Sequence, residues 1–96
     1  MEQAQNISVT QCCLHYSIET SFVEDLHHYG LIELTQSSGE SFISYEQLAD
    51  LEKYMHLHYD LDINMAGMET ISHLLARVQQ LQHELRKLRA DMLTEE

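Results

Sequence analysis

Cysteine and histidine side chains stand close together near the start of this chain, where they could hold a metal ion. Cys12 and Cys13 are adjacent, and His15 follows two residues later. If this segment is helical, adjacent side chains point about 100° apart, so the two thiols cannot readily bind one ion. A free cysteine otherwise behaves as a small apolar residue. We therefore expect Cys12 and Cys13 in the core rather than in a metal site.

The other histidines do not have the spacing of a metal site either. Seven histidines occur, but His27-His28 and His56-X-His58 lack the i,i+4 spacing that places two ligands on one helical face. Glu24 and His28 have this spacing, yet no third ligand is evident, and a solvated pair is the better interpretation. The sequence predicts no zinc site.

The segment Asp60-X-Asp62-X-Asn64 begins like the calcium-binding loop of an EF-hand. Met65 stands where that loop needs glycine, and Ile71 stands where it needs a bidentate glutamate. No arrangement of nucleophile and base is readable from the scattered Ser, His and acidic residues. We therefore predict no calcium site, no cofactor and no enzymatic activity.

Charge is the most unusual property of the composition. Sixteen acidic residues face five basic ones, which gives a formal net charge of −11. Residues 1–76 contain twelve acids and a single base, Lys53, whereas residues 77–96 contain four of each. Phosphate backbones repel such a surface, since Lys and Arg supply most of the affinity for nucleic acid. The pattern indicates a basic protein partner; the alternative is acid that only keeps the chain soluble.

The C-terminal part of the chain has the heptad pattern of one long helix, from Met65 to Leu93. The apolar residues at its two seam positions are Ile71, Leu74, Val78, Leu81, Leu85, Leu88 and Met92. Asn64 can cap this helix, which at roughly 40 Å is longer than the small domain before it. Only its first two turns can pack on that domain, so the remaining seam predicts a homodimer through a coiled coil.

The chain is expected to divide into a domain of residues 1–63 and a dimerisation helix of residues 64–96. Three capping boxes, beginning at Ser8, Ser21 and Ser44, predict helix starts in the domain. The helices are expected over 8–16, 21–29 and 44–59. Gly30 is placed to end the second helix.

A β-hairpin is expected between the second and third helices. Residues 32–35 and 41–43 read as strands, residues 36–40 as a turn, and residues 7–9 can add a short strand. These elements predict a mainly α fold, a winged helix-turn-helix with a small β-hairpin wing and a long C-terminal coiled-coil helix. The residues expected in its core are Val9, Cys12, Cys13, Tyr16, Phe22, Val23, Leu26, Tyr29, Leu48, Leu51, Met55, Tyr59, Leu61 and Ile63.

The sequence also indicates a compartment. No apolar run approaches the length of a membrane span, and the start Met-Glu-Gln-Ala-Gln-Asn has neither the basic beginning nor the apolar core of a signal peptide. Two adjacent cysteines suit a reducing environment better than a disulfide framework. We expect a cytoplasmic protein with no membrane contact.

Short motifs spread from Ile7 to Met92 resemble a known family. They are Cys13-Leu14-His15, Ile18 with Glu19, Gly30-Leu31-Ile32-Glu33, Leu57, Leu61-Asp62-Ile63-Asn64 and Gly67, followed by the heptad helix. In this order they resemble the MerR-type winged helix and, more closely, the chaperone modulator CbpM family. That family often has an aromatic residue and a proline where this chain has Met65 and Ala66.

The resemblance implies an adaptor that binds the J-domain of a DnaJ-like, curved-DNA-binding co-chaperone of the CbpA type. Such an adaptor blocks the action of that co-chaperone with its Hsp70. For the dimer, Glu84 and Arg89 occupy flanking positions that would pair in a parallel coiled coil. The MerR resemblance favours the antiparallel arrangement, and we expect that one.

The sign of the charge separates this interpretation from DNA binding. A DNA-binding relative should place Arg, Lys or Tyr on its second helix and wing. The corresponding positions here hold Ser21, Glu24, Asp25 and His28 on the helix and Glu33 and Glu40 in the wing. Carboxylates stand where cations are needed, so binding to nucleic acid is disfavoured.

A J-domain, as the resemblance implies, presents a basic helix to its Hsp70, and an acidic face could compete for that helix. The predicted partner-binding residues are Glu24, Asp25, His28, Glu33 and Glu46. The alternative is a DNA-binding transcriptional regulator of the MerR type.

Overall fold

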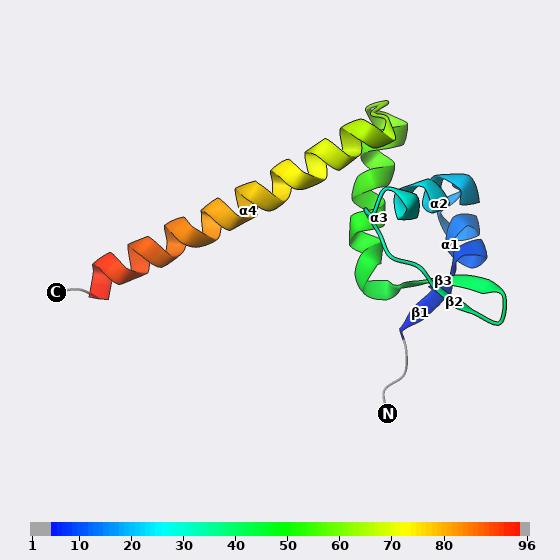
Figure 1. Cartoon of the computed structure of the whole chain (residues 1–96), viewed down its shortest axis with the longest axis horizontal. Coiled ribbons are helices and arrows are strands. Elements are labelled where there is room, and N and C mark those ends of the chain that lie inside the picture. Colours follow the sequence, from blue (N-terminus) through cyan, green and yellow to red (C-terminus); the bar gives the residue numbers. More distant parts are fainter. Residues whose placement is uncertain (1–4, 95–96) are drawn as a thin grey trace.

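Helices make up most of the chain, and a small sheet lies beside them in the N-terminal domain (Figure 1). The computed structural model describes residues 5–94, so the predicted ranges 1–63 and 64–96 include terminal residues outside it. The elements are β1 (Asn6–Ser8), α1 (Val9–Tyr16), α2 (Thr20–His28), β2 (Thr35–Ser37), β3 (Glu40–Ser44), the 3₁₀ turn η1 (Tyr45–Gln47), α3 (Leu48–Met55), the π-helical turn η2 (His56–Asp60) and α4 (Met65–Thr94). This order confirms the predicted winged helix-turn-helix with a long C-terminal helix.

Local capping fixes α1 and the turn that follows it. Ser8 has an extended backbone, and its hydroxyl accepts a hydrogen bond from the Gln11 N–H at 3.1 Å, as the first capping box predicts. At the other end Ser17 adopts the left-handed conformation, with a φ of 60°. The N–H groups of Ser17 and Ile18 both donate to the Cys13 carbonyl. These bonds satisfy a helix-end carbonyl and turn the chain toward α2.

The second and third capping boxes are wrong. Glu19 is the N-cap of α2, so Ser21 is already helical, and its hydroxyl lies 3.4 Å from a Glu19 carboxylate oxygen. Ser44 has the extended backbone of an N-cap, but its side chain makes no capping bond, and a 3₁₀ turn precedes α3. Gln47, the last residue of that box, bonds the backbone of Glu33 instead. A contact between distant segments has replaced the local cap.

The wing is part of a three-stranded antiparallel sheet in the order β1-β3-β2. β1 pairs Ile7 with Ile43, which confirms the additional strand. The hairpin between β2 and β3 closes through Ser38 and Gly39, which both have positive φ, as a tight two-residue hairpin turn requires. The turn is therefore shorter than the five residues expected from the sequence.

The first strand of the hairpin also begins later than predicted. An extended strand was expected from Ile32, but β2 covers Thr35–Ser37. Ile32 is buried in the core, and the N–H and carbonyl of Glu33 both bond the side chain of Gln47. These backbone groups are not available to a neighbouring strand.

One apolar core joins the helices of the domain to the first turn of α4. Its buried members are Val9, Cys12, Cys13, Phe22, Val23, Leu26, Ile32, Ile43, Leu51, Tyr54 and Met68. Tyr16, Leu48, Met55 and Ile63 pack against this cluster while partly exposed. Most of the predicted core positions are confirmed.

Three predicted core residues are wrong, since Tyr29, Tyr59 and Leu61 are exposed. Tyr29 caps the end of α2 immediately before the left-handed Gly30, where the chain turns away from the helix axis. Tyr59 lies in η2, and the wider π-helical turn rotates its side chain outward. Leu61 follows that turn and is carried into solvent with it.

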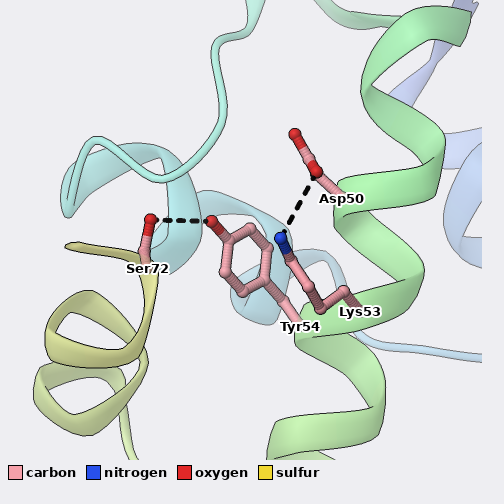
Figure 2. A network of polar contacts seen from close by, with 4 residues as sticks. All are labelled: Asp50, Lys53, Tyr54 and Ser72. Atoms are coloured by element: carbon pink, nitrogen blue, oxygen red, sulfur yellow. Dashed lines mark hydrogen bonds and ion pairs between the residues drawn. The ribbon is translucent and has the colours of Figure 1, made fainter. Parts of the chain in front are cut away.

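α4 begins on the domain and then leaves it (Figure 1). The Asn64 Oδ1 atom accepts a hydrogen bond from the Gly67 N–H at 2.8 Å, which confirms the predicted cap. Met68 is fully buried, and the Tyr54 hydroxyl of α3 lies 3.4 Å from the Ser72 hydroxyl of α4 (Figure 2). From residue 73 to residue 94 every side chain is exposed. Only the first two turns of α4 therefore pack on the domain, as predicted.

The protruding helix gives the molecule an elongated outline of 59 × 41 × 20 Å. Its radius of gyration is 17.4 Å, against about 12–13 Å for a compact chain of this length. Within residues 5–94, no helix combines the length and the apolar character needed to cross a membrane.

Candidate functional site

Three of the predicted partner-binding residues lie on the solvent side of α2. Apolar residues bury the opposite side of this helix, which leaves Glu24, Asp25 and His28 exposed; we name these three the α2 acidic face. Burial raises the pKa of the Cys13 thiol on α1, and the charge of Glu24 adds to this effect.

Asp25 borders a hollow of about 430 Å³ between α2, η2 and the start of α4. Glu19 contributes a second carboxylate to this hollow. Phe22 and His58, whose ring centroids are 4.8 Å apart in a stacked arrangement, form part of its wall. Acidic groups thus meet an aromatic wall at this end of α2.

Gln47 joins the two segments that carry Glu33 and Glu46. The Gln47 Oε1 atom accepts from the Glu33 N–H, and its Nε2 atom donates to the Glu33 carbonyl, both at 2.7 Å. Glu46 immediately precedes Gln47, so two exposed carboxylates stand on adjoining segments. No hydrogen bond or ion pair within residues 5–94 joins this pair to the α2 acidic face. The five predicted residues therefore form two groups along the chain, three on α2 and two on the segments that flank the β2–β3 hairpin.

The single base of residues 1–76 does not neutralise either group. The Lys53 Nζ atom lies 3.6 Å from Asp50 on α3 and 5.6 Å from the centroid of the Tyr54 ring (Figure 2). In the part of the chain that the structure describes, no carboxylate of α2 or the wing forms an ion pair. The surface of the helix-turn-helix is therefore negative, as the sequence predicts.

Cys12 and Cys13 are both buried in the core, as predicted. Burial raises the pKa of each thiol, so both stay protonated at neutral pH. A thiol in this environment is a poor nucleophile and a poor metal ligand. Among residues 5–94, no three His, Cys, Asp or Glu side chains are grouped in a way that could hold a metal ion.

The acidic linker before α4 has structural contacts in place of a calcium loop. Asp60 lies 2.8 Å from the Nδ1 atom of His56. Asp62 adopts the left-handed conformation, and Asn64 caps α4. Asp60 and Asn64 therefore bond different groups of the chain.

The predicted dimerisation residues form an exposed apolar edge along α4. Ile71 is half-buried near the domain. The others, with between 45 and 74% of their surface exposed, are Leu74, Val78, Leu81, Leu85, Leu88 and Met92. Beyond Ile71, nothing within residues 5–94 covers this edge.

Two contacts that shape the domain surface were missed by sequence reasoning. One is the Gln47–Glu33 pairing, which joins residues 14 positions apart. The other is a hydrogen bond of 2.7 Å from the Tyr16 hydroxyl to Glu52, 36 positions away. Neither has a signal in local periodicity, because both depend on how the helices pack.

Two short helices, a β wing and a long terminal helix define the class of winged helix-turn-helix proteins. A family model described as MerR HTH family regulatory protein matches residues 7–90. The chain therefore belongs to the MerR HTH family of regulatory proteins, which confirms the predicted MerR relationship. No curated protein and no solved structure matches the sequence significantly. The narrower relationship to CbpM stays a prediction.

Proposed function

We propose that this MerR-family protein is a non-catalytic modulator that acts in the cytoplasm. It binds the J-domain of a DnaJ-like co-chaperone and inhibits the action of that co-chaperone with Hsp70. The supporting observation is the sign of the surface: α2 and the wing carry exposed carboxylates and neither Lys nor Arg. These are the elements through which a winged helix otherwise reads DNA. The resemblance to CbpM supplies the J-domain as the basic partner.

Charge and apolar contacts have different parts in this proposal. The α2 acidic face, with Glu33 and Glu46, attracts a basic helix over several ångströms and speeds its encounter with the protein. Apolar contacts then determine how long the complex lasts. Binding of this kind occupies the J-domain surface that Hsp70 would use.

The proposal includes a homodimer formed through α4. The heptad edge from Leu74 to Met92 stays exposed in the single chain, and pairing two such edges would remove them from water. We expect the antiparallel arrangement. Two J-domain sites would then be carried by one dimer.

A DNA-binding regulator is the second candidate function, and the match to the MerR regulatory family favours it. Such a protein needs cations toward the phosphates, and α2 offers His27 and His28 as its nearest approach to a base. A gel shift with duplex DNA at low salt tests this function. Retarded duplex would support the regulator and contradict the proposal based on charge.

Binding of an isolated J-domain tests the proposed function directly. Calorimetric titration at about 0.05 M and about 0.5 M salt should give weaker binding at the higher concentration, because screening shortens the reach of the carboxylates. The double variant Glu24→Gln, Asp25→Asn should lower the association rate and leave the dissociation rate nearly unchanged. Glu84→Gln, which removes one acid from the far part of α4, is the control. Absence of binding at low salt would contradict the proposal.

A further inference from the structure

Tyr16 borders two adjoining hollows that lie outside the predicted site. The first, of about 580 Å³, lies between β1, α1, η1 and the start of α3. The second, of about 300 Å³, lies between the turn after α1 and the α3–η2 segment. Tyr16 belongs to the lining of both, so the two hollows adjoin at this side chain. We name the two hollows together the Tyr16 tract.

The first hollow is mainly apolar. Ile7, Leu14, Tyr45 and Leu48 contribute to its lining. Leu14 has 76% of its surface exposed and Tyr45 has 49%, although neighbouring apolar residues of α1 are buried. Large apolar side chains held in water beside a hollow are typical of an anchoring site for a partner.

The second hollow combines aromatic rings with carboxylates. The Tyr16 hydroxyl donates to the Glu52 Oε2 atom at 2.7 Å, which fixes both side chains. Tyr59, Asp60, His56 and Ser17 contribute further polar lining, and Met55 adds an apolar contact. The His56 Nδ1 atom lies 2.8 Å from the Asp60 Oδ2 atom. No Lys or Arg lines either hollow. Carboxylates beside aromatic faces suit a guanidinium or ammonium group.

We infer that the Tyr16 tract is the docking site for an amphipathic, basic helix of the partner, an inference that rests on the proposed function. Aliphatic side chains of that helix enter the apolar hollow, as in helix-in-groove recognition. A Lys or Arg of the same helix enters the second hollow and pairs with Glu52 and Asp60, through the carboxylate oxygens that do not bond Tyr16 and His56. The α2 acidic face steers the encounter, and the Tyr16 tract anchors the complex.

The apolar half is tested by Leu14→Glu, measured against an isolated J-domain. Leu14 is exposed, so the substitution leaves the core intact, but it puts a charge where the partner buries an aliphatic group. The dissociation constant should rise about tenfold or more, mainly through faster dissociation. Leu61→Glu makes the same change at an exposed leucine outside the tract and should stay within about twofold. Circular dichroism and thermal melting confirm that both variants are folded.

The acidic half is tested by Glu52→Gln. Glutamine keeps an oxygen that can accept the Tyr16 hydroxyl, so the variant removes charge while the hydrogen bond is retained. The dissociation constant should rise several-fold, and its salt dependence should weaken. Glu40→Gln in the wing removes an equal charge outside the tract and serves as the control.

The outcomes separate the two proposals. If the J-domain binds the unaltered chain in a salt-dependent way but Leu14→Glu and Glu52→Gln match their controls, the Tyr16 tract is excluded and the proposed function stands. If the unaltered chain does not bind the J-domain, both proposals are overturned. If the same variants change the dimer mass in light scattering rather than J-domain affinity, the tract holds a second copy of this chain, and the inference is wrong.

Discussion

The N-terminal domain and the free part of α4 use similar apolar residues in opposite ways. Leu26 of α2 is fully buried, whereas Leu85 of α4 has 47% of its surface exposed. Full burial of such a side chain stabilises a fold by about 1.5–3 kcal/mol. The domain obtains this stabilisation within one chain, while the edge of α4 can obtain it only from another surface. The contrast places the stabilising core in the domain and leaves on α4 an apolar edge that is available for the proposed assembly.

Charge divides the same two regions. Residues 1–76 hold one base among twelve acids, and residues 77–96 are balanced. A balanced helix can approach its own copy without net repulsion, whereas the acidic domain repels another acidic domain. The proposed division of roles follows from this asymmetry: α4 pairs with itself, and the domain takes a basic partner.

The largest loss of folding stability is expected in the N-terminal domain, from Leu51→Ala. Leu51 is fully buried in the core, so its truncation leaves a cavity and should lower the free energy of unfolding by about 2–5 kcal/mol. Leu14→Ala, at a leucine with 76% of its surface exposed, should cost less than about 0.5 kcal/mol. Urea denaturation followed by circular dichroism measures both. Equal losses would mean that the core is not where stability resides.

An intermediate effect, on the association of two chains, is expected on α4 from Leu85→Asp. A carboxylate in the middle of the apolar edge would be buried on pairing, at a high cost in desolvation, so the dimer should become a monomer. Light scattering measures the mass. Gln79→Asp adds the same charge on a different face of α4 and should leave the mass unchanged. A dimer that survives Leu85→Asp would place the contact between copies elsewhere.

The sequence predicted the parts of this structure that depend on near neighbours. Ser8 and Asn64 cap their helices as expected, and the predicted end of the long helix lies one residue from the observed end at Thr94. These features follow from hydrogen bonds three residues apart and from heptad periodicity. Local rules are sufficient for them.

Features set by distant contacts were not predictable in the same way. Gln47 completes the pattern of a capping box, yet its amide bonds Glu33, and nothing in the box distinguishes the two possibilities. The π-helical turn η2 exposes Tyr59, which a regular helical period would bury. The sequence likewise gave no indication that Tyr16 meets Glu52. The sign of the surface was predictable from the sequence, but these contacts between distant segments were not.

The smallest effect is expected on the ionisation of Tyr16, at the surface of the N-terminal domain. This tyrosine should keep its proton to unusually high pH. Burial, the hydrogen bond to Glu52 and the charge of that carboxylate raise the pKa of Tyr16 to about 12. An unfolded tyrosine has a pKa of about 10. The stabilisation linked to this proton is therefore complete below about pH 10 and is lost as the pH rises through about 12.

Phenolate absorbance of the folded protein measures this effect, as an ionisation step near about pH 12. Tyr16→Phe should remove this step, whereas Tyr29→Phe, at an exposed tyrosine, should keep it. If no ionisation step appears near about pH 12 while circular dichroism shows the fold intact, Tyr16 is solvated. The surface between α1 and α3 would then be as open to water as the free edge of α4.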